Sequence, residues 1–364
     1  MNFYIHVPFC AAKCGYCAFY SEAGAASELM VRYVDHLEKE LFQVDTSGCE
    51  TIYIGGGTPT FLPLPLLERL LKLVHSRLCP GKDCEISIEA NPETLDPSKV
   101  GLLRQYVSRI SVGVQSFDPE LRSRIGRNCS QEKLLSALKL LREADFPHWN
   151  CDLIYSLPGQ SIAMWEADLR QAVETGADHI SCYSLTPEEN SRLGATFMCD
   201  DEYELQCYSL AENVLAEYGI ARYEISNYSR PGCECRHNVN VWRGGLLRGF
   251  GPAAAGFDGL DRMIAVESLS DWLDDAPPER DHISIPARLN EIFAVNLRTV
   301  GGWTPDLWSL VPGADSWRNR LEIAENLKKS FPEGLLISPE CIKLSPEGLL
   351  FWNTIAQELI IYGD

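Results

Sequence analysis

The sequence CAAKCGYC at residues 10–17 places three cysteines within eight positions, near the start of a chain of 364 residues. Soft thiolate ligands at this spacing suit an iron-sulfur cluster or a zinc ion. A structural zinc ion needs a fourth ligand, which His6 could supply, whereas a cubane cluster held by three cysteines leaves one iron open to a cofactor. The spacing favours a [4Fe-4S] cluster on Cys10, Cys14 and Cys17, with structural zinc and ordinary buried cysteines as the alternatives.

Strand-like segments rich in β-branched and aromatic residues alternate with amphipathic helical segments along the chain. The expected strands are Phe3–Val7, Thr51–Ile54, Glu85–Glu89, Arg109–Val114, Cys151–Ile154 and His179–Leu185. The expected helices include Leu29–Phe42, Leu64–Leu78, Glu132–Leu141, Met164–Val173 and Glu202–Glu217. Repeated βα units build parallel sheets, so we predict an α/β fold in which six units form an open, partial (β/α)6 barrel.

Short polar or glycine-rich motifs follow five of these strands. They are CAAKCGYC, GGGTP, EANPE, GVQSF and DLIYSLPGQ, in chain order. Because the carboxyl ends of parallel strands meet at one rim, loops that follow the strands build a common ligand site. We therefore expect the cysteines and the polar residues after the later strands to face one shared site.

The sequence also predicts how the chain divides. Residues 1–260 are expected to hold the barrel and the segments that flank it. Residues 261–286 are polar and contain SDWLDDAPPERDHISIP, which is typical of a linker. Residues 287–364 alternate between short helical patterns and turns. We expect them to form a small, mainly α C-terminal domain.

Bulk composition restricts the classes of partner. The formal charge is -19 and the sequence pI is about 4.8, so the average surface repels phosphate backbones. The first residues lack a basic segment followed by a long apolar run, and no later apolar run reaches the roughly 18 residues needed to span a bilayer. We predict a cytoplasmic protein without nucleic-acid partners or a transmembrane segment, in which most of the fourteen cysteines are reduced thiols.

The cysteine loop resembles that of the radical S-adenosylmethionine (SAM) superfamily, whose CxxxCxxC motif binds a [4Fe-4S] cluster. The resemblance implies that the open iron chelates SAM and that the reduced cluster passes it an electron, which yields methionine and a 5'-deoxyadenosyl radical. It also implies that Tyr16 packs near the adenine. The glycine-rich turn is similar to the superfamily motif that contacts the SAM amino group, here Gly56, Gly57 and Thr58; a tight structural turn is the alternative.

Further motifs resemble the coproporphyrinogen oxidase-like branch of that superfamily. They are YIHVPFC, IEANP, GVQSF, IGRN and CDLIYSLPG. This resemblance implies that the side chains of five residues contact SAM: Tyr4, Glu89, Gln115, Arg127 and Asp152. Taken alone, each of the four at strand ends is more typical of a residue that caps a loop or forms a salt bridge.

The segment YEISNYSRPGCECRHNVNVW at residues 223–242 is similar to the HNxxYW region of HemW-type heme chaperones. The resemblance implies that His237 ligates heme, whereas a purely structural His–Trp pair is the alternative. Three positions depart from the family pattern: Val241 replaces its tyrosine, and Cys129 and Ala255 replace histidines. These departures bear on heme handling more than on the cluster.

The resemblance predicts a heme chaperone that binds heme and delivers it to acceptor haemoproteins, with membrane-associated respiratory enzymes among the candidates. The alternative is a radical SAM enzyme like the oxygen-independent coproporphyrinogen III oxidase. Phe19 stands where true oxidases have a fourth cysteine, and only nine residues precede Cys10, whereas the oxidases carry a longer N-terminal extension. We therefore expect no coproporphyrinogen decarboxylation, and either a monomer or a homodimer. Modification of tRNA is a third, weaker hypothesis because the chain is acidic.

Overall fold

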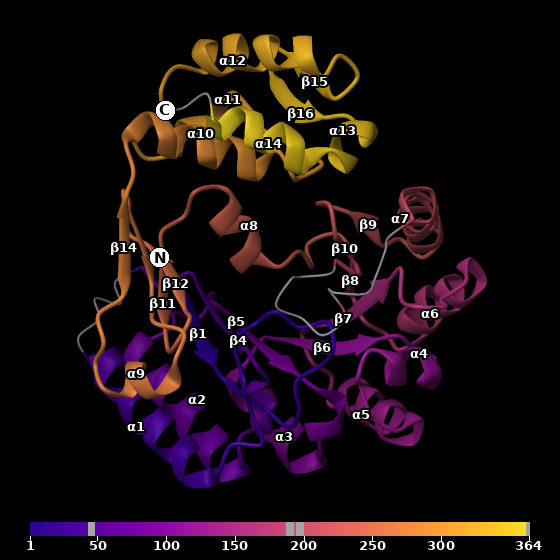
Figure 1. Ribbon diagram of the computed structural model, residues 1–364, viewed down its shortest axis with the longest axis vertical. Helices are drawn as coiled ribbons and strands as arrows, with labels where there is room; N and C mark the ends of the chain where they lie inside the picture. The colour runs from indigo at the N-terminus through magenta and orange to yellow at the C-terminus, as the bar shows by residue number, and fades with distance from the viewer. Residues whose placement is uncertain (43–47, 187–192, 194–199, 362–364) are drawn as a thin grey trace.

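The computed structural model describes all residues except 43–47, 187–192, 194–199 and 362–364. One large sheet dominates it, with strand order β14-β13-β12-β11-β1-β4-β5-β6-β7-β8-β10-β9. Neighbouring strands from β11 to β8 pair in parallel, which makes a curved, open barrel (Figure 1). The parallel strands are β1 (Asn2–Val7), β4 (Thr51–Gly56), β5 (Glu85–Ala90), β6 (Arg109–Gln115), β7 (His148–Tyr155), β8 (His179–Ser184) and β11 (Leu247–Phe250).

The structure confirms all six strands that the sequence predicts and adds β11 beside β1. Helices cover the outer face of the sheet, as the amphipathic patterns predict. They are α1 (Ser27–Phe42), α2 (Leu64–Leu78), α3 (Pro97–Tyr106), α4 (Pro119–Arg124), α5 (Gln131–Glu143), α6 (Ile162–Glu174) and α7 (Asp201–Ala216). Side chains of Asp96, Ser130, Ser161 and Asp200 accept hydrogen bonds from first-turn amides and so begin four of these helices.

Antiparallel strands extend both edges of the parallel sheet. Beyond β8 lie β10 (Asn227–Ser229) and β9 (Ala221–Arg222). Beyond β11 lie β12 (Ala255–Phe257), β13 (Asp261–Ile264) and β14 (Glu279–His282). The expected linker, residues 261–286, thus supplies two strands of the main sheet and helix α9 (Leu269–Leu273).

Helix α9 is packed rather than free. The Trp272 indole lies 4.2 Å from the His36 ring and donates from Nε1 to Glu40 Oε1 at 3.0 Å, both on α1. Burial of this large aromatic side chain fixes the segment against the barrel, so residues 261–286 are not an unstructured connection. The division of the chain into domains at residues 260 and 287 stays a prediction.

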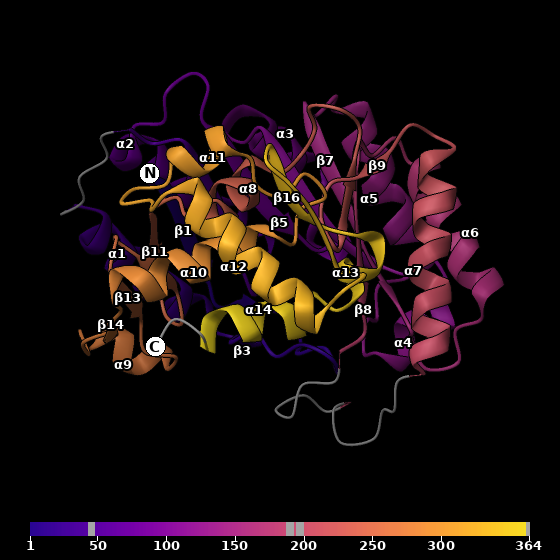
Figure 2. The ribbon, with the colours of Figure 1, turned by 90° about the horizontal axis from the view of Figure 1, so that it is seen from above.

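The last 80 residues have a hydrophobic core of their own, built around Phe293, Trp303 and Trp308. The elements are α10 (Ile285–Asn296), α11 (Pro305–Ser309), α12 (Trp317–Ser330), β15 (Leu335–Ser338), β16 (Cys341–Leu344), α13 (Pro346–Leu350) and α14 (Trp352–Ile361). Figures 1 and 2 show this unit across one side of the barrel, with α8 (Arg236–Trp242) between the two. Among the described helices, none is both long enough and apolar enough to cross a membrane.

We predict that Trp303→Ala destabilises the protein by about 3–5 kcal/mol, because it removes a fully buried indole from the second core. The indole stacks on Phe293, meets Trp308 edge-on at 5.1 Å and donates to the Phe293 carbonyl at 2.9 Å. Urea unfolding followed by circular dichroism measures the loss. Leu310→Ala, at a side chain that is 77% exposed, is the control and should cost under about 0.5 kcal/mol. Equal losses in both variants would contradict this packing.

Candidate functional site

The cysteine loop leaves the carboxyl end of β1 and is held by backbone hydrogen bonds on both flanks. Two short strands, β2 (Phe9–Cys10) and β3 (Glu22–Ala23), pair in parallel and close its base. In its middle, the Gly15 amide donates to the Ile125 carbonyl at 2.9 Å. The loop is thereby fixed over the barrel mouth, and the thiols of Cys10, Cys14 and Cys17 all line the same cavity.

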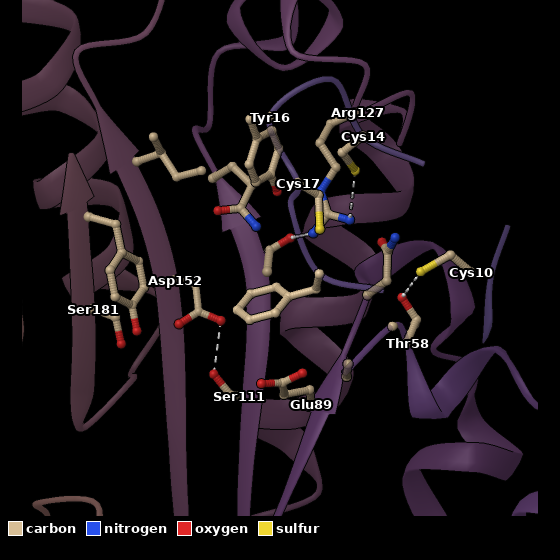
Figure 3. Close-up of a pocket in the computed structure, with 18 of the residues that line it drawn as sticks. Cys10, Cys14, Tyr16, Cys17, Thr58, Glu89, Ser111, Arg127, Asp152 and Ser181 are labelled. Carbon is tan, nitrogen blue, oxygen red and sulfur yellow. Dashed lines mark hydrogen bonds between the residues drawn. The ribbon is translucent and has the colours of Figure 1, made fainter. Parts of the chain in front are cut away.

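This cavity has a volume of about 660 Å³ and runs from the cysteine loop into the barrel interior (Figure 3). It brings together eleven of the thirteen residues predicted for the site. They are Cys10, Cys14, Tyr16, Cys17, Gly56, Gly57, Thr58, Glu89, Gln115, Arg127 and Asp152. Most of the candidate residues therefore lie in one cavity, as expected for loops that follow parallel strands and share one rim.

The glycine-rich turn after β4 is tied directly to the cysteine loop. The Gly57 amide donates to the Val7 carbonyl at 2.9 Å, and the Thr58 amide donates to the Phe9 carbonyl at 2.7 Å. The Thr58 hydroxyl lies 3.6 Å from Cys10 Sγ. These contacts make the two loops one rigid frame, so a ligand bound beside the thiols would also meet the turn.

Two carboxylates face the cavity below this frame. Glu89 Oε2 accepts from the Gly56 amide at 3.0 Å, and its Oε1 accepts from the Tyr53 hydroxyl at 3.0 Å. Asp152 accepts from the Ser111 hydroxyl at 2.9 Å and from Asn150 Nδ2 at 2.7 Å. Both groups are acceptors suited to hydroxyl or ammonium groups of a ligand.

Burial sets the charge state of this carboxylate pair. Burial, and then the negative charge of Asp152, raise the pKa of Glu89 from its ordinary 4.5 to about 7. Burial likewise raises the pKa of Asp152, although its hydrogen bonds to Ser111 and Asn150 oppose this. A cationic or hydrogen-bond-donating ligand would relieve the repulsion between the two groups.

Arg127 supplies positive charge beside the cysteines. Its Nη1 lies 3.8 Å from Cys14 Sγ, and its Nη2 donates to the Gly113 carbonyl at 2.9 Å. A Cβ atom at Gly113 would lie only 2.3 Å from Nη2, so glycine makes room for the guanidinium. Burial opposes its charge, but the neighbouring Tyr16 and Cys14 outweigh this and raise the pKa of Arg127. Arg127 is therefore a buried cation close enough to stabilise a thiolate at Cys14.

Gln115 ends β6 in a strained conformation. Its φ is +70°, in the left-handed region that non-glycine residues rarely adopt, and the β6–β7 register shifts between Gly113 and Gln115. The side chain is buried and lines the cavity. A bulge at a strand end that aims a polar group into a cavity is typical of a functional site.

The donors at the loop fit a cluster, which Cys10, Cys14 and Cys17 would hold. The alternative, a structural zinc site with protein ligands only, needs His6 as the fourth ligand. Its Nδ1 is bonded to the Tyr4 hydroxyl at 3.2 Å and its Nε2 to the Tyr20 carbonyl at 3.0 Å. His6 is therefore occupied in the barrel wall and is not a free ligand for the loop.

Tyr4 and His237 are the two predicted site residues that do not line the cavity. Tyr4 stacks on Tyr53 with ring centroids 6.2 Å apart. His237 is buried at the opposite end of β4, where its Nδ1 lies 2.8 Å from the Thr51 hydroxyl. Direct contact of Tyr4 with SAM and ligation of heme by His237 both stay predictions.

The motifs of the sequence do not include the residues that form the polar floor of the cavity. Arg109, Ser111, Asn150, His179 and Ser181 line it together with the predicted carboxylates. The alternation of side chains along each strand could have identified these residues, because side chains two residues apart share one face of the sheet. In β6, every second side chain from Arg109 to Gln115 faces the interior, and the apolar ones between them pack under the helices.

We predict that the ligand-free protein loses stability as the pH rises from about 5 to about 8, and that Glu89→Gln reduces this loss. Between pH 4.5 and about 7 the folded state retains a proton on Glu89 that the unfolded chain has released. The free energy of unfolding therefore falls as pH increases. Urea unfolding at several pH values should show the variant more stable at about pH 8 by roughly 1–3 kcal/mol.

The matched control for this measurement is Glu120→Gln, at a side chain that is 82% exposed. Its unfolding free energy should follow that of the unmodified protein across the whole range. If Glu89→Gln also runs parallel to the unmodified protein at every pH, the raised pKa of Glu89 is wrong.

Comparisons with known proteins agree with this geometry. A family model described as the radical SAM superfamily matches residues 4–172. The chain is 38% identical over 263 residues to the heme chaperone HemW of Escherichia coli (strain K12), a match covering 70% of each chain. It is 32% identical over 317 residues to the heme chaperone HemW of Bacillus subtilis (strain 168), covering 82% of this chain and 83% of the relative.

A solved structure shares the fold over almost the whole chain. Coproporphyrinogen III oxidase (HemN) from Escherichia coli superimposes with a TM-score of 0.83 at 20% identity, covering 99% of this chain and 90% of that one. At this identity the likeness concerns the fold alone, and it confirms the predicted α/β radical SAM architecture. From the sequence identities over more than two thirds of each relative, this protein belongs to the radical SAM superfamily and, within it, to the HemW family.

Proposed function

We propose that this protein is a heme chaperone: it holds a SAM-coordinating [4Fe-4S] cluster at the cysteine loop, binds heme at α8, and delivers heme to acceptor haemoproteins. The observation that carries the proposal is the position of His237 at the end of the barrel opposite the cysteines. Relatives at 38% and 32% identity bear the name heme chaperone HemW and support the same function.

At the cluster end, each group has a definite task. Cys10, Cys14 and Cys17 would hold the cluster, which when bound supplies electron transfer to SAM. The guanidinium of Arg127 offsets the negative charge of thiolate ligands. Glu89 and Asp152 offer carboxylate oxygens to hydroxyl or ammonium groups of SAM, and the frame at Thr58 fixes where SAM lies.

At the other end, His237 has the protonation state that heme ligation needs. Burial lowers the pKa of His237 to about 4, so its imidazole is neutral near pH 7. Nδ1 is bonded to the Thr51 hydroxyl, and Nε2 has no hydrogen-bond partner among the described residues. A histidine whose second nitrogen is held by a hydrogen bond is the usual arrangement at metal centres.

Access to His237 requires α8 to shift, because the side chain is only 6% exposed. The His237 amide donates to Glu85 Oε1 at 2.9 Å, and its ring lies 5.2 Å from that of Tyr53. At the carboxyl end of α8, Arg298 lies 4.7 Å over the Trp242 ring. We infer that heme binding moves this helix of seven residues away from β4.

The proposed heme ligand and the cysteine loop lie at opposite ends of β4. His237 contacts Thr51, the first residue of β4, whereas the glycine turn begins at its last residue, Gly56. Five steps of about 3.3 Å along a strand separate these positions by about 17 Å. His237 therefore stands at the amino end of β4 and the cysteine loop at its carboxyl end, and two separate ligand positions favour carrying heme over decarboxylating a porphyrinogen.

The proposal includes a cytoplasmic location and release of heme to acceptor haemoproteins, among them membrane-associated respiratory enzymes. The net charge of -19 argues against anionic lipid as a docking surface. Transfer is then expected to proceed by contact with the acceptor protein itself.

Cluster binding gives the first test. Cys10→Ala, Cys14→Ala and Cys17→Ala should each abolish the brown iron-sulfur absorption after anaerobic reconstitution, because each removes one of only three thiolate ligands. Cys341→Ala, at a partly buried thiol outside the cavity, is the control and should retain the full absorption. Unchanged spectra in all three loop variants would refute the cluster.

Heme binding gives the second test. Titration of the reconstituted protein with heme should saturate, and His237→Ala should weaken the affinity roughly tenfold or more because the axial ligand is lost. His282→Ala, at a side chain that is 71% exposed, should bind as the unmodified protein does. The same samples are assayed for coproporphyrinogen decarboxylation, which should be absent. Absence of heme binding together with substrate-dependent release of deoxyadenosine would instead assign a radical SAM enzyme.

A further inference from the structure

Three metal-ligating side chains meet at the amino end of the barrel, on the side away from the cysteine loop. His148 is the first residue of β7, Asp178 directly precedes β8, and Cys233 lies in the loop before α8. Their ligand atoms all lie within 4.8 Å of one another, and His148 Nδ1 is 2.6 Å from Asp178 Oδ2. The three residues are distant in the sequence, so their meeting is a product of the fold.

The backbone holds Cys233 rigidly in this position. Its amide donates to the Arg230 carbonyl at 3.0 Å, which closes a turn with Pro231 second and Gly232 third. Gly232 has φ +81°, the value that the third position of a type II turn requires. The Arg230 amide in turn donates to the Asp178 carbonyl at 2.9 Å. The turn is thus fastened to the residue that supplies the carboxylate.

The other two groups are oriented as well. Asp178 Oδ1 accepts from the Trp149 amide at 3.1 Å, which leaves Oδ2 directed at His148. Arg109 Nη1 donates to the Cys233 carbonyl at 3.0 Å, which adds a further hydrogen bond to the turn. Ligands fixed in this way lose little conformational freedom when an ion binds.

The spacing and donor types suit zinc. Bonds of about 2.0–2.3 Å in a tetrahedral shell place ligand atoms roughly 3–4 Å apart, so only small side-chain shifts are needed. Imidazole, carboxylate and thiolate are the three zinc ligand classes. The His148 side chain is 37% exposed and that of Asp178 16%, which leaves room for entry from solvent and for a water ligand.

The charge balance of the ion-free site also suits a cation. Burial, and then the carboxylate of Asp178, raise the pKa of Cys233 to about 11. Arg109 offsets part of this negative charge, while Glu234 adds to it. A divalent ion would replace the thiol proton and satisfy thiolate and carboxylate together.

We propose that His148, Asp178 and Cys233 bind one zinc ion, with water as the fourth ligand, and that this ion fastens the loop before α8 to β7 and β8. Binding forms a zinc–sulfur bond and releases the Cys233 proton, and any proton on the coordinating nitrogen of His148, to solvent. No oxidation or reduction is involved. The site is separate from the cysteine loop and does not depend on the heme function.

Zinc titration of the anaerobically reconstituted full chain, with iron and zinc counted by mass spectrometry, tests the site. We expect one zinc per chain in addition to the cluster iron. Cys233→Ser and Asp178→Asn should each weaken zinc binding at least tenfold, because either change removes one of three protein ligands. X-ray absorption spectroscopy at the zinc edge should show one sulfur neighbour, whereas zinc misplaced on the cysteine loop would show three.

A matched control exists in this chain. His282 and Asp261 form a second His–Asp pair with the same 2.6 Å contact, so His282→Ala should leave zinc binding unchanged. Circular dichroism of Cys233→Ser verifies that the variant is folded. The site is refuted if the unmodified protein takes up no additional zinc, if the ion has a sulfur-rich shell, or if Cys233→Ser binds zinc as tightly as the unmodified protein.

Discussion

The alternation of side chains along the parallel strands is the constraint on which this structure depends. In β6, Ile110, Val112 and Val114 are buried under the helices, whereas Arg109 and Ser111 face the interior cavity. A shift of one residue would exchange the two faces and bury charge in the apolar layer. The helical shell and the polar cavity are therefore specified by alternate residues of the same strands.

The direction of the strands then divides the barrel into two ends with different chemistry. At the carboxyl ends, loops are long enough to hold the cysteines and the glycine turn, and strand bulges such as that at Gln115 aim polar groups inward. At the amino ends, segments return to the sheet and place His237 and Cys233 close to strand beginnings. Strands β4 and β5 each contact both ends, which sets a fixed separation between them.

Local patterns were sufficient for every parallel strand except β11, and for α2, whose bounds Leu64–Leu78 agree with the prediction. They did not predict β14, because every residue of this strand is exposed and gives no alternation of apolar side chains to detect. The edge strand exists only through its pairing with β13, a long-range contact. For the same reason the meeting of His148 with Cys233 could not be predicted, since no short-range pattern links them.

Helix α8 connects the two ends through the cavity itself. Cys235 and Asn238 line the cavity that begins at the cysteine loop, while His237 between them packs away from it against Thr51. Consider a ligand that reaches the cavity floor and contacts these side chains only when α8 is docked. Its binding free energy is more favourable for the docked helix than for the displaced one, and this difference stabilises the docked helix. Docked α8 keeps His237 buried, so such a ligand would oppose heme ligation, and heme would oppose the ligand to the same degree. Occupancy of the cluster end would in this way govern heme at the other end without any contact between the two.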